Sequence, residues 1–486
     1  MAIENQRREM VDGAAAIARG ALDAGCNYYA GYPITPASGI LTHMLRELPK
    51  VGGIGLQGED EISSMGHCIG AATAGATVFT ASSGPGLSLY SENIGLAIMM
   101  EVPLVIAISQ RLGPSTGAAT ASAQGDIQFM RWCNSGGYPV IVLSPTNIPE
   151  SYHLIKRAFK LAKRFRSPVF IATDKETVMT TESVSEAEMI NAPDWPEIPD
   201  EPVGKPLDPY QINGSIHHYT GSSHNEEGHI TKDPDIIAEF NERLKNKIES
   251  RVDEISLVNA DLQDGAGTLI ISYGVSARSM EAAVNHLRDQ GEKVSALTVY
   301  SLWPIPEKKI KNCLKGIKRI IIPEMNHGQY RHEIERLTND EIELVGVNRV
   351  DTFLITPEEI MARTYSRGVK WFLIGVVIHE VGHNYYPMIV NSDERQWTWM
   401  DEGLNTYHQF LAEQSWEEDY PARRGLPRAI TRYMRDTENS RPIMTASESL
   451  LQFGSNAYAK PATALNVLRE TVVGRELFDH AMHEYT

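Results

Sequence analysis

The stretch Ala30-Gly-Tyr-Pro-Ile-Thr-Pro-Ala-Ser38 decides how the chain begins to fold. It follows a short apolar run, Cys26 to Ala30, which we expect to form a buried strand. Pro33 and Pro36 cannot continue a strand ladder, and each biases the residue before it toward an extended conformation. We therefore expect the Thr35 hydroxyl, between them, to be held at the carboxyl end of a strand. Open α/β sheets bind ligands at that edge, although an ordinary proline-rich connection would show the same pattern.

Outward from this stretch, short apolar runs alternate with helical patterns over residues 1–185. Strands are expected at residues 26–30, 54–57, 76–81, 104–109, 140–143 and 169–173. This alternation predicts a doubly wound parallel sheet, an α/β fold with helices on both faces. The long loop 110–126 is rich in Gly, Ser and Thr, which favours a functional loop.

Three segments of different character follow. Residues 186–264 form a linker with clustered prolines, a charged helix and a polar tract that holds His217, His218, His224 and His229. That tract is either a solvated loop or a weak metal site, because no tight ligand spacing is present. Residues 265–363 predict a smaller α/β domain. Residues 368–486 are mainly helical in pattern and hold four of the seven tryptophans, which suggests a different origin.

Composition limits the possible partners and the location. The net charge is −17, which argues against nucleic acid or an anionic membrane as a partner. No apolar run approaches the roughly 18 to 20 residues that a spanning helix needs, and the polar N-terminus does not resemble a signal peptide. The four cysteines include no C-x-x-C pair. We therefore expect a cytoplasmic protein with reduced thiols and no iron–sulfur cluster bound by this chain alone.

Three polar residues are expected at the carboxyl edge of the first sheet. They are Thr35, Glu61 at the start of a helix, and Arg111 directly after the strand 104–109. An arginine in this position suits two-point binding of a carboxylate. The alternative is a surface arginine paired with Asp126 or Glu59.

Motifs in order along residues 1 to about 363 resemble the alpha subunit of 2-oxoacid:ferredoxin oxidoreductases, most closely the 2-oxoglutarate type. The matching text is Gly31-Tyr-Pro-Ile-Thr-Pro36, Glu59-Asp-Glu-Ile62, Ser83-Gly-Pro-Gly86, Arg111-Leu-Gly-Pro-Ser-Thr-Gly117, Gln124-Gly-Asp126 and Pro323-Glu-Met-Asn326. The resemblance implies that residues 1–185 are a pyrimidine-type thiamine diphosphate domain and residues 265–363 a transketolase-C-terminal-like domain. It implies that Glu61 hydrogen-bonds the aminopyrimidine ring. Thr35 and Arg111 would hold the oxo and carboxylate oxygens of the 2-oxoacid, with Thr35 also beside the cofactor.

The same resemblance implies a partner chain. The sequence contains no Gly-Asp-Gly with a downstream Asn to hold Mg²⁺ and the diphosphate, and no cysteine cluster to take electrons. A beta subunit would supply the diphosphate site, the magnesium ion and the iron–sulfur cluster. The complex would decarboxylate a 2-oxoacid to an acyl-CoA and pass electrons to ferredoxin.

The last quarter carries a separate motif, His379-Glu-Val-Gly-His383, with Glu402 following after 18 residues. On a helix the two histidines share one face, as zinc ligands do, with two core histidines as the bland alternative. Residues 368–486 resemble a fragment of the aminopeptidase-N-like gluzincin metallopeptidases. The resemblance implies that His379, His383 and Glu402 bind zinc, that Glu380 is the general base, and that Tyr458 stabilises the oxyanion.

Two further hypotheses therefore remain open beside the oxidoreductase subunit. One is a zinc-dependent peptidase acting on peptides, although the Gly-x-Met-Glu-Asn strand that anchors the free amine of a peptide is not found. The other is a chimeric chain in which neither activity is intact. The junction at residues 365–370 has no Gly/Ser-rich or Pro-rich linker, which fits an abrupt fusion.

Overall fold

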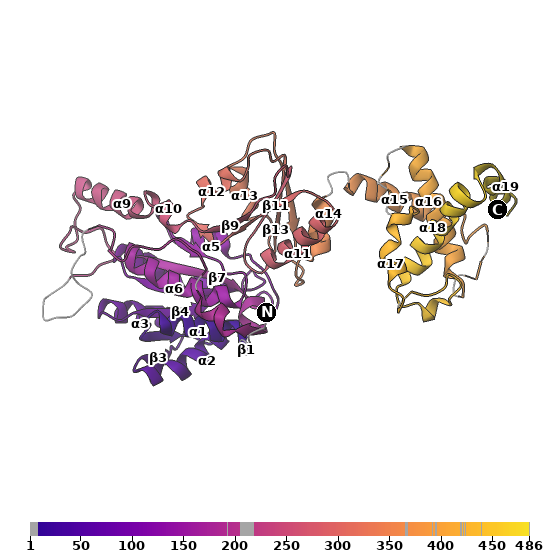
Figure 1. The fold of residues 1–486 in the computed structure, drawn as a ribbon. Helices are drawn as coiled ribbons and strands as arrows, with labels where there is room; N and C mark the ends of the chain where they lie inside the picture. The colour runs from indigo at the N-terminus through magenta and orange to yellow at the C-terminus, as the bar shows by residue number, and fades with distance from the viewer. Residues whose placement is uncertain are drawn as a thin grey trace, which may run out of the picture. The chain divides into compact units, whose positions relative to one another are not determined.

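A computed structural model describes residues 8–191, 193–204, 218–364, 368–390, 392–393, 396–417, 420, 422, 424–438 and 440–485. The chain divides into two compact units, residues 1–364 and residues 365–486, and each is described by itself (Figure 1). His217 and residues 365–367 of the expected junction lie outside the described residues. No helix among the described residues is both long enough and apolar enough to span a bilayer.

A seven-stranded sheet with the order β12-β6-β7-β5-β4-β2-β3 forms the centre of the first domain. Its strands are β2 (Tyr28–Gly31), β3 (Ile54–Gln57), β4 (Val78–Ser82), β5 (Leu104–Gln110), β6 (Ile141–Leu143), β7 (Pro168–Asp174) and β12 (Ser301–Trp303). All pairs are parallel except β12 with β6. The middle strands β4, β5 and β7 are buried along their whole length, as is usual in a parallel sheet covered on both faces.

Two layers of helices cover this sheet. Residues alternate along β5, so that Ile106 joins one hydrophobic cluster with α3 and α4, and Val105 joins another with α1, α2 and α6. The helices of the domain are α1 (Gly13–Asp23), α2 (Ser38–Glu47), α3 (Glu61–Thr73), α4 (Gly84–Met99), α5 (Ile127–Arg131), α6 (Ile148–Phe165), α7 (Lys175–Met179) and α8 (Glu186–Ile190). A small antiparallel ribbon pairs β1 (Arg8–Asp12) with β8 (Thr181–Ser185).

The strand order reverses between β2 and β4. From β2 the chain crosses to β3 on one side, and after α3 it returns to β4 on the other side of β2. Ligand crevices of doubly wound sheets form at such a reversal, outside the carboxyl ends of the strands. The loop that holds Thr35 follows β2, and the Ser83–Gly86 turn follows β4, so both lie at this position.

A second, five-stranded sheet with the order β14-β13-β10-β11-β9 follows. Its strands are β9 (Val258–Asp261), β10 (Thr268–Ser272), β11 (Val294–Val299), β13 (Arg319–Glu324) and β14 (Glu343–Asn348), and only β9 is antiparallel. Its helices are α11 (Ser276–Asp289), α12 (Glu307–Asn312), α13 (Arg331–Glu335) and α14 (Pro357–Thr364). Between β11 and α12 the chain contributes β12 to the first sheet, where Ser301 pairs with Leu143.

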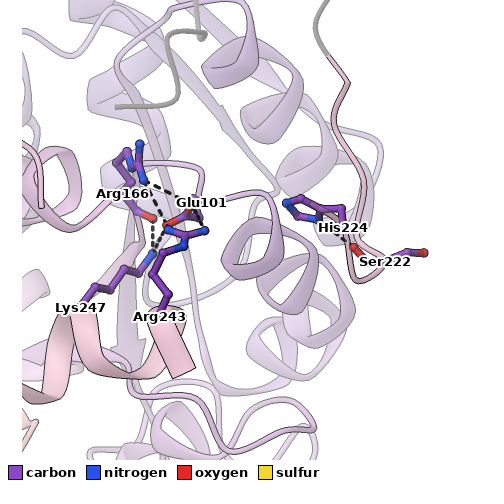
Figure 2. A network of polar contacts seen from close by, with 6 residues as sticks. All are labelled: Glu101, Arg166, Ser222, His224, Arg243 and Lys247. Atoms are coloured by element: carbon purple, nitrogen blue, oxygen red, sulfur yellow. Dashed lines mark hydrogen bonds and ion pairs between the residues drawn. The ribbon is translucent and has the colours of Figure 1, made fainter. Parts of the chain in front are cut away.

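The helix α9 (Pro234–Glu249), followed by α10 (Val252–Ile255), is fastened to the first domain by a buried ion cluster (Figure 2). Glu101, just past the end of α4, is 1% exposed and accepts from Lys247 Nζ at 2.9 Å, Arg243 Nη2 at 2.9 Å and Arg166 Nη2 at 3.3 Å. Burial would raise the pKa of the Glu101 carboxyl, but the three cations outweigh it and lower the pKa to about 2.

Among the described residues, no potential metal-ligand cluster is found in the histidine tract before α9. The cluster that is found lies in the C-terminal unit. The ring of His224 packs against Phe240 with centroids 4.4 Å apart, and its Nδ1 lies 2.8 Å from Ser222 O. The rings of His218 and His229 lie 4.4 Å apart. His224 is therefore part of the packing under α9.

The described residues of the C-terminal unit form helices joined by turns, and no strand is found among them. Its main elements are α15 (Gly368–Gly382), η2 (Trp399–Gly403), α16 (Leu404–Trp416), α17 (Thr431–Arg435), η5 (Gly454–Ala459), α18 (Lys460–Val467), η6 (Leu468–Val472) and α19 (Arg475–Tyr485), with short helical turns η3 (Pro427–Ala429) and η4 (Ser447–Ser449) between them. One small core joins α16, α18 and α19 through Tyr407, Ala462 and Phe478.

Candidate functional site

Thr35 and Arg111 meet at the carboxyl edge of the first sheet. Arg111 follows β5 and is 6% exposed, and its Nη1 donates to Thr35 O at 2.6 Å while Nη2 donates to Thr116 O at 3.2 Å. A guanidinium has five N–H donors, so three remain, including a buried Nε with no partner among the described residues. The alternative ion pair of Arg111 with Asp126 or Glu59 is not found among the described residues.

Glu61 lies on the neighbouring side of the same edge. It opens α3 directly after Asp60, whose side chain caps the helix by accepting from Ser63 N at 2.7 Å. Glu61 is 6% exposed, and no hydrogen bond of its carboxyl is found among the described residues. A Cβ on Gly86 would lie 3.0 Å from Glu61 Oε1 and would overlap Ser82 Oγ. Glycine at position 86 therefore lets the Glu61 carboxyl approach the first turn of α4.

Ser83 leaves the start of α4 open to a ligand. It occupies the N-cap position, but its side chain makes no capping hydrogen bond, and its buried Oγ has no partner among the described residues. Buried polar groups are nearly always paired, and unpaired N–H groups at a helix start favour anions or acceptors. Together with Glu61 and Arg111, these unpaired groups fit a polar ligand. A buried acid whose carboxyl has no hydrogen bond among the described residues fits the pyrimidine ring of thiamine diphosphate.

The far end of the loop 110–126 is anchored on the second domain. Gln124 N donates to Met325 O at 2.9 Å, Gln124 Nε2 donates to Tyr273 O at 3.2 Å, and Gln124 Oε1 accepts from Ser276 Oγ at 2.7 Å. Gly274 has φ +54, and a Cβ there would lie 2.5 Å from Gln124 Nε2. The sequence singled out Gln124 only as part of a motif, because its partners lie about 150 to 200 residues away.

Glu324 stabilises the part of the second domain that Gln124 contacts. It is fully buried and accepts from Tyr273 Oη at 3.0 Å, Tyr330 N at 2.9 Å and Arg331 N at 3.1 Å. Burial raises the pKa of the Glu324 carboxyl, against the opposing effect of these donors. Asn326 Nδ2 donates to Gln124 O at 2.7 Å. The Pro323–Asn326 motif therefore holds the loop that carries Arg111.

A separate cluster lies in the C-terminal unit. His379 Nε2 and His383 Nε2 lie 3.1 Å and 3.3 Å from Glu402 Oε2, and ligand atoms of the three residues lie within 4.8 Å of one another. The remaining ring nitrogens are held from behind, by Gln409 Oε1 at 2.9 Å for His379 Nδ1 and by Tyr386 O at 2.9 Å for His383 Nδ1. Two imidazoles with one carboxylate, each oriented by a second contact, fit a zinc ion.

The other two residues of the peptidase motif lie differently. Tyr458 donates its hydroxyl to Glu402 Oε1 at 2.6 Å, and its ring stacks on His379 at 5.7 Å. Burial raises the pKa of this hydroxyl, and the Glu402 carboxylate adds to the effect. Glu380 is exposed. In this arrangement the Tyr458 hydroxyl is bound to Glu402, and its expected role at a developing oxyanion stays a prediction.

Comparison with known proteins matches the first unit. Residues 19–242 match the thiamine-diphosphate-binding domain of pyruvate flavodoxin/ferredoxin oxidoreductases, and residues 266–360 match core domain II of pyruvate:ferredoxin oxidoreductase. The chain is 38% identical over 360 residues to 2-oxoglutarate synthase subunit KorA of Methanocaldococcus jannaschii, covering 72% of this chain and 98% of the relative. It is 38% identical to subunit KorA of Archaeoglobus fulgidus over 73% of this chain and 97% of the relative.

A solved structure is also similar. The 2-oxoglutarate:ferredoxin oxidoreductase of Magnetococcus marinus, which has 2-oxoglutarate, coenzyme A and succinyl-CoA bound, superposes with a TM-score of 0.67 at 30% identity. The match covers 75% of this chain and 66% of that chain.

Proposed function

Because the chain belongs to the 2-oxoacid:ferredoxin oxidoreductase family as an alpha subunit, we propose that it supplies the pyrimidine-binding half of a thiamine diphosphate site that oxidises 2-oxoglutarate to an acyl-CoA. The observation that carries this proposal is the joining of Arg111 to the Thr35 loop at the strand-order reversal, with Glu61 on the neighbouring turn. Thiamine diphosphate supplies the electron sink for carbon–carbon bond cleavage beside a carbonyl.

Glu61, Arg111 and Thr35 each have a defined role in the proposal. Glu61, which is buried and whose carboxyl has no hydrogen bond among the described residues, holds a proton at a nitrogen of the pyrimidine ring. The free N–H donors of Arg111 bind the carboxylate of the 2-oxoacid, and the Thr35 hydroxyl donates to its oxo oxygen. The second domain holds the Arg111 loop through Gln124 and keeps these donors in place before substrate arrives.

The other half of the site comes from a beta subunit. That chain would hold the diphosphate, Mg²⁺ and an iron–sulfur cluster, bind CoA with this chain, and pass electrons to ferredoxin. The names of the relatives support both the subunit organisation and 2-oxoglutarate as the substrate.

Reconstitution tests this function. The chain is co-expressed with a matching beta subunit, and CoA-dependent viologen reduction is compared for 2-oxoglutarate, pyruvate and 2-oxoisovalerate. We expect turnover with 2-oxoglutarate, no turnover for this chain alone, and loss of turnover in Glu61→Ala. Glu59→Ala, an exposed carboxylate two residues away, is the matched control and should remain active. Unchanged turnover in Glu61→Ala would contradict the assignment.

A second candidate function rests on the three converging ligands of the C-terminal unit. His379, His383 and Glu402 would hold a zinc ion, and Glu380 would take a proton from water during hydrolysis of a peptide. Zinc would supply Lewis-acid activation of that water. The missing amine-anchoring strand argues for zinc binding without efficient peptidase turnover, which is also what a chimeric chain would show.

Zinc content of the purified chain tests this second candidate. We expect about one zinc per chain, and none above background in His383→Ala. His480→Ala is the matched control, since that histidine is exposed on α19 and outside the cluster. A chain without zinc at neutral pH would rule out the metal site. Hydrolysis of aminoacyl-nitroanilides, measured on the same samples, separates zinc binding from peptidase activity.

A further inference from the structure

Asp126 is a half-buried acid beside the proposed substrate site, with a buried Oδ2, and neither proposed activity uses it. It follows Gln124, whose contacts with the second domain fix its position. Its main-chain N donates to Gln110 Oε1 at 3.2 Å, and its carboxyl faces the start of α4. A Cβ on Gly84 would lie 2.9 Å from Asp126 Oδ1 and 3.1 Å from Oδ2. Because Gly84 and Gly86 carry no Cβ, the Asp126 carboxyl can lie against Gly84 and the Glu61 carboxyl against Gly86.

The groups around Asp126 favour the binding of an anion. The 16-residue helix α4 begins there, with the uncapped and buried Ser83 hydroxyl at its N-cap. The buried Nε of Arg111 is also without a partner among the described residues. Helix starts and guanidinium groups both favour anions. An ionised Asp126 would occupy this environment itself and repel a substrate carboxylate, whereas a protonated Asp126 would add a donor.

The Asp126 carboxyl is suited to hold a proton. Its Oδ2 is buried and has no hydrogen-bond partner among the described residues. Burial raises the pKa of Asp126 to about 6, against the opposing charge of Arg111. The charged groups at this corner are Arg111, after β5, and Glu61, on α3 at the next glycine, while Gln110 on β5 is neutral. Half of the chains would therefore carry the proton near pH 6.

We propose that Asp126, in its protonated form, donates a hydrogen bond to an anionic oxygen of the 2-oxoacid that Arg111 binds. The substrate is then held by one cation and one neutral acid at the start of α4, and the proton stays on Asp126 throughout. This inference rests on the proposed oxidoreductase function and assigns a further substrate-binding residue to that site. It makes substrate affinity depend on pH through a residue of this chain.

The pH dependence of KM tests the assignment in the complex with the beta subunit. KM for 2-oxoglutarate is measured from pH 5.5 to 8.5 in the unmutated complex, Asp126→Asn, Asp126→Ala and the exposed-acid control Glu59→Gln. If only the protonated form binds, KM of the unmutated complex rises up to about fifty-fold from pH 6 to pH 8, because the competent fraction falls from about a half to about a hundredth. Glu59→Gln should follow the same curve.

The amide of Asp126→Asn donates without titrating, so its KM should vary less than about twofold over this range. Asp126→Ala should show a high KM at every pH, with thermal unfolding recorded to confirm that each variant is folded. A KM of the unmutated complex that is flat with pH, a slope retained in Asp126→Asn, or a low KM in Asp126→Ala would overturn the assignment.

Binding without turnover separates this inference from the proposed function. Calorimetric titration of the complex with glutarate, a dicarboxylate that lacks the oxo group, is carried out at pH 6 and pH 8 on the same variants. If 2-oxoacid oxidation is absent but glutarate binds more tightly at pH 6, and Asp126→Asn removes that difference, the function fails and the binding role of Asp126 stands. No difference between the two pH values refutes the role of Asp126 alone.

Discussion

Arg111 holds Thr35 by its main-chain carbonyl and not by its hydroxyl, with Nη1 2.6 Å from Thr35 O. The contact joins the loop after β2 to the loop after β5 across the intervening strand β4. It leaves the Thr35 side chain without a hydrogen bond among the described residues, so the hydroxyl remains free to meet a ligand. One arginine thus joins two loops and keeps N–H donors for an anion.

Replacement of this arginine by lysine should weaken substrate binding. A lysine is a point charge that cannot reach Thr35 O, Thr116 O and a carboxylate at once. We expect Arg111→Lys to raise KM for 2-oxoglutarate about tenfold or more, equivalent to loss of one charge-assisted hydrogen bond. Arg278→Lys, which changes an exposed ion pair with Glu182, is the control. The prediction is wrong if KM of Arg111→Lys stays within about twofold of the unmutated complex.

A methyl group at Gly86 should strain the start of α4. Its Cβ would overlap Ser82 Oγ and lie 2.9 Å from Glu61 Cγ. We expect Gly86→Ala to lower the free energy of unfolding of the first unit by about 1 to 3 kcal/mol, as overpacking does. Gly66→Ala is the control in α3, where a Cβ would meet nothing within 4 Å. That change should be neutral or stabilising by up to about 1 kcal/mol, as read from urea unfolding of the isolated chain.

Removal of the Gln124 side chain should loosen the Arg111 loop. Gln124→Ala leaves the buried Tyr273 carbonyl and the Ser276 hydroxyl without this partner, at a cost of about 1 to 3 kcal/mol in stability. Limited proteolysis should then cleave residues 110–126 faster, and KM should rise, whereas the exposed Gln290→Ala should change neither. Equal proteolysis rates for Gln124→Ala and the unmutated chain would count against an anchoring role.

Loss of the Glu101 charge should detach α9. Glu101→Gln leaves Lys247 buried beside two arginines, so we expect the free energy of unfolding to fall by about 3 to 5 kcal/mol. Glu242→Gln, an exposed carboxylate on α9 itself, should change it by less than about 1 kcal/mol.

The lowered pKa of Glu101 also predicts how its contribution to stability changes with pH. Its pKa in the folded chain, about 2, lies below the usual value, so its contribution is complete above about pH 4.5 and is lost as pH falls toward 2. The stability difference between the unmutated chain and Glu101→Gln should therefore shrink between pH 4.5 and pH 3. A difference that stays constant over this window would contradict the assignment of the charge to Glu101.

Metal removal should act on the C-terminal unit alone. If zinc binds His379, His383 and Glu402, a chelator such as dipicolinate should lower the melting temperature of residues 365–486, because a site that exists only in the folded state links binding to stability. Turnover of the reconstituted oxidoreductase should not change. Calorimetric scans with and without chelator report both units, and His383→Ala should remove the effect of the chelator.

Local sequence patterns predicted some parts of this molecule and could not predict others. Apolar runs predicted the parallel strands of the first sheet to within a few residues, as for 104–109 against β5 at Leu104–Gln110. The Thr35 loop and Arg111 were expected at one edge because parallel strands end together. The contact between Arg111 and Thr35 uses the main-chain carbonyl of Thr35. Every residue has such a carbonyl, so no sequence pattern indicates this contact. The charged helix expected within residues 186–264 is divided into α9 and α10 by a break at Ser250–Arg251.

Contacts between distant segments were not predictable from one sequence. Glu101 meets Arg243 and Lys247 across more than 140 residues, and Gln124 meets Ser276 across 152. No periodicity relates such positions. The spacing of His379, His383 and Glu402 did predict their convergence, since helical geometry places the histidines on one face. It did not reveal that Tyr458 would donate to Glu402.

The pairing of β12 with β6 means that the border between the domains in sequence is not a border in space. A chain shortened to end at residue 264 would lack Ser301–Trp303, and the apolar strand Ile141–Leu143 would become an open edge with unpaired main-chain groups. Such edges recruit strands from other molecules. The first domain should therefore aggregate when it is made without the second, so the two have to be inherited, expressed and engineered as one piece.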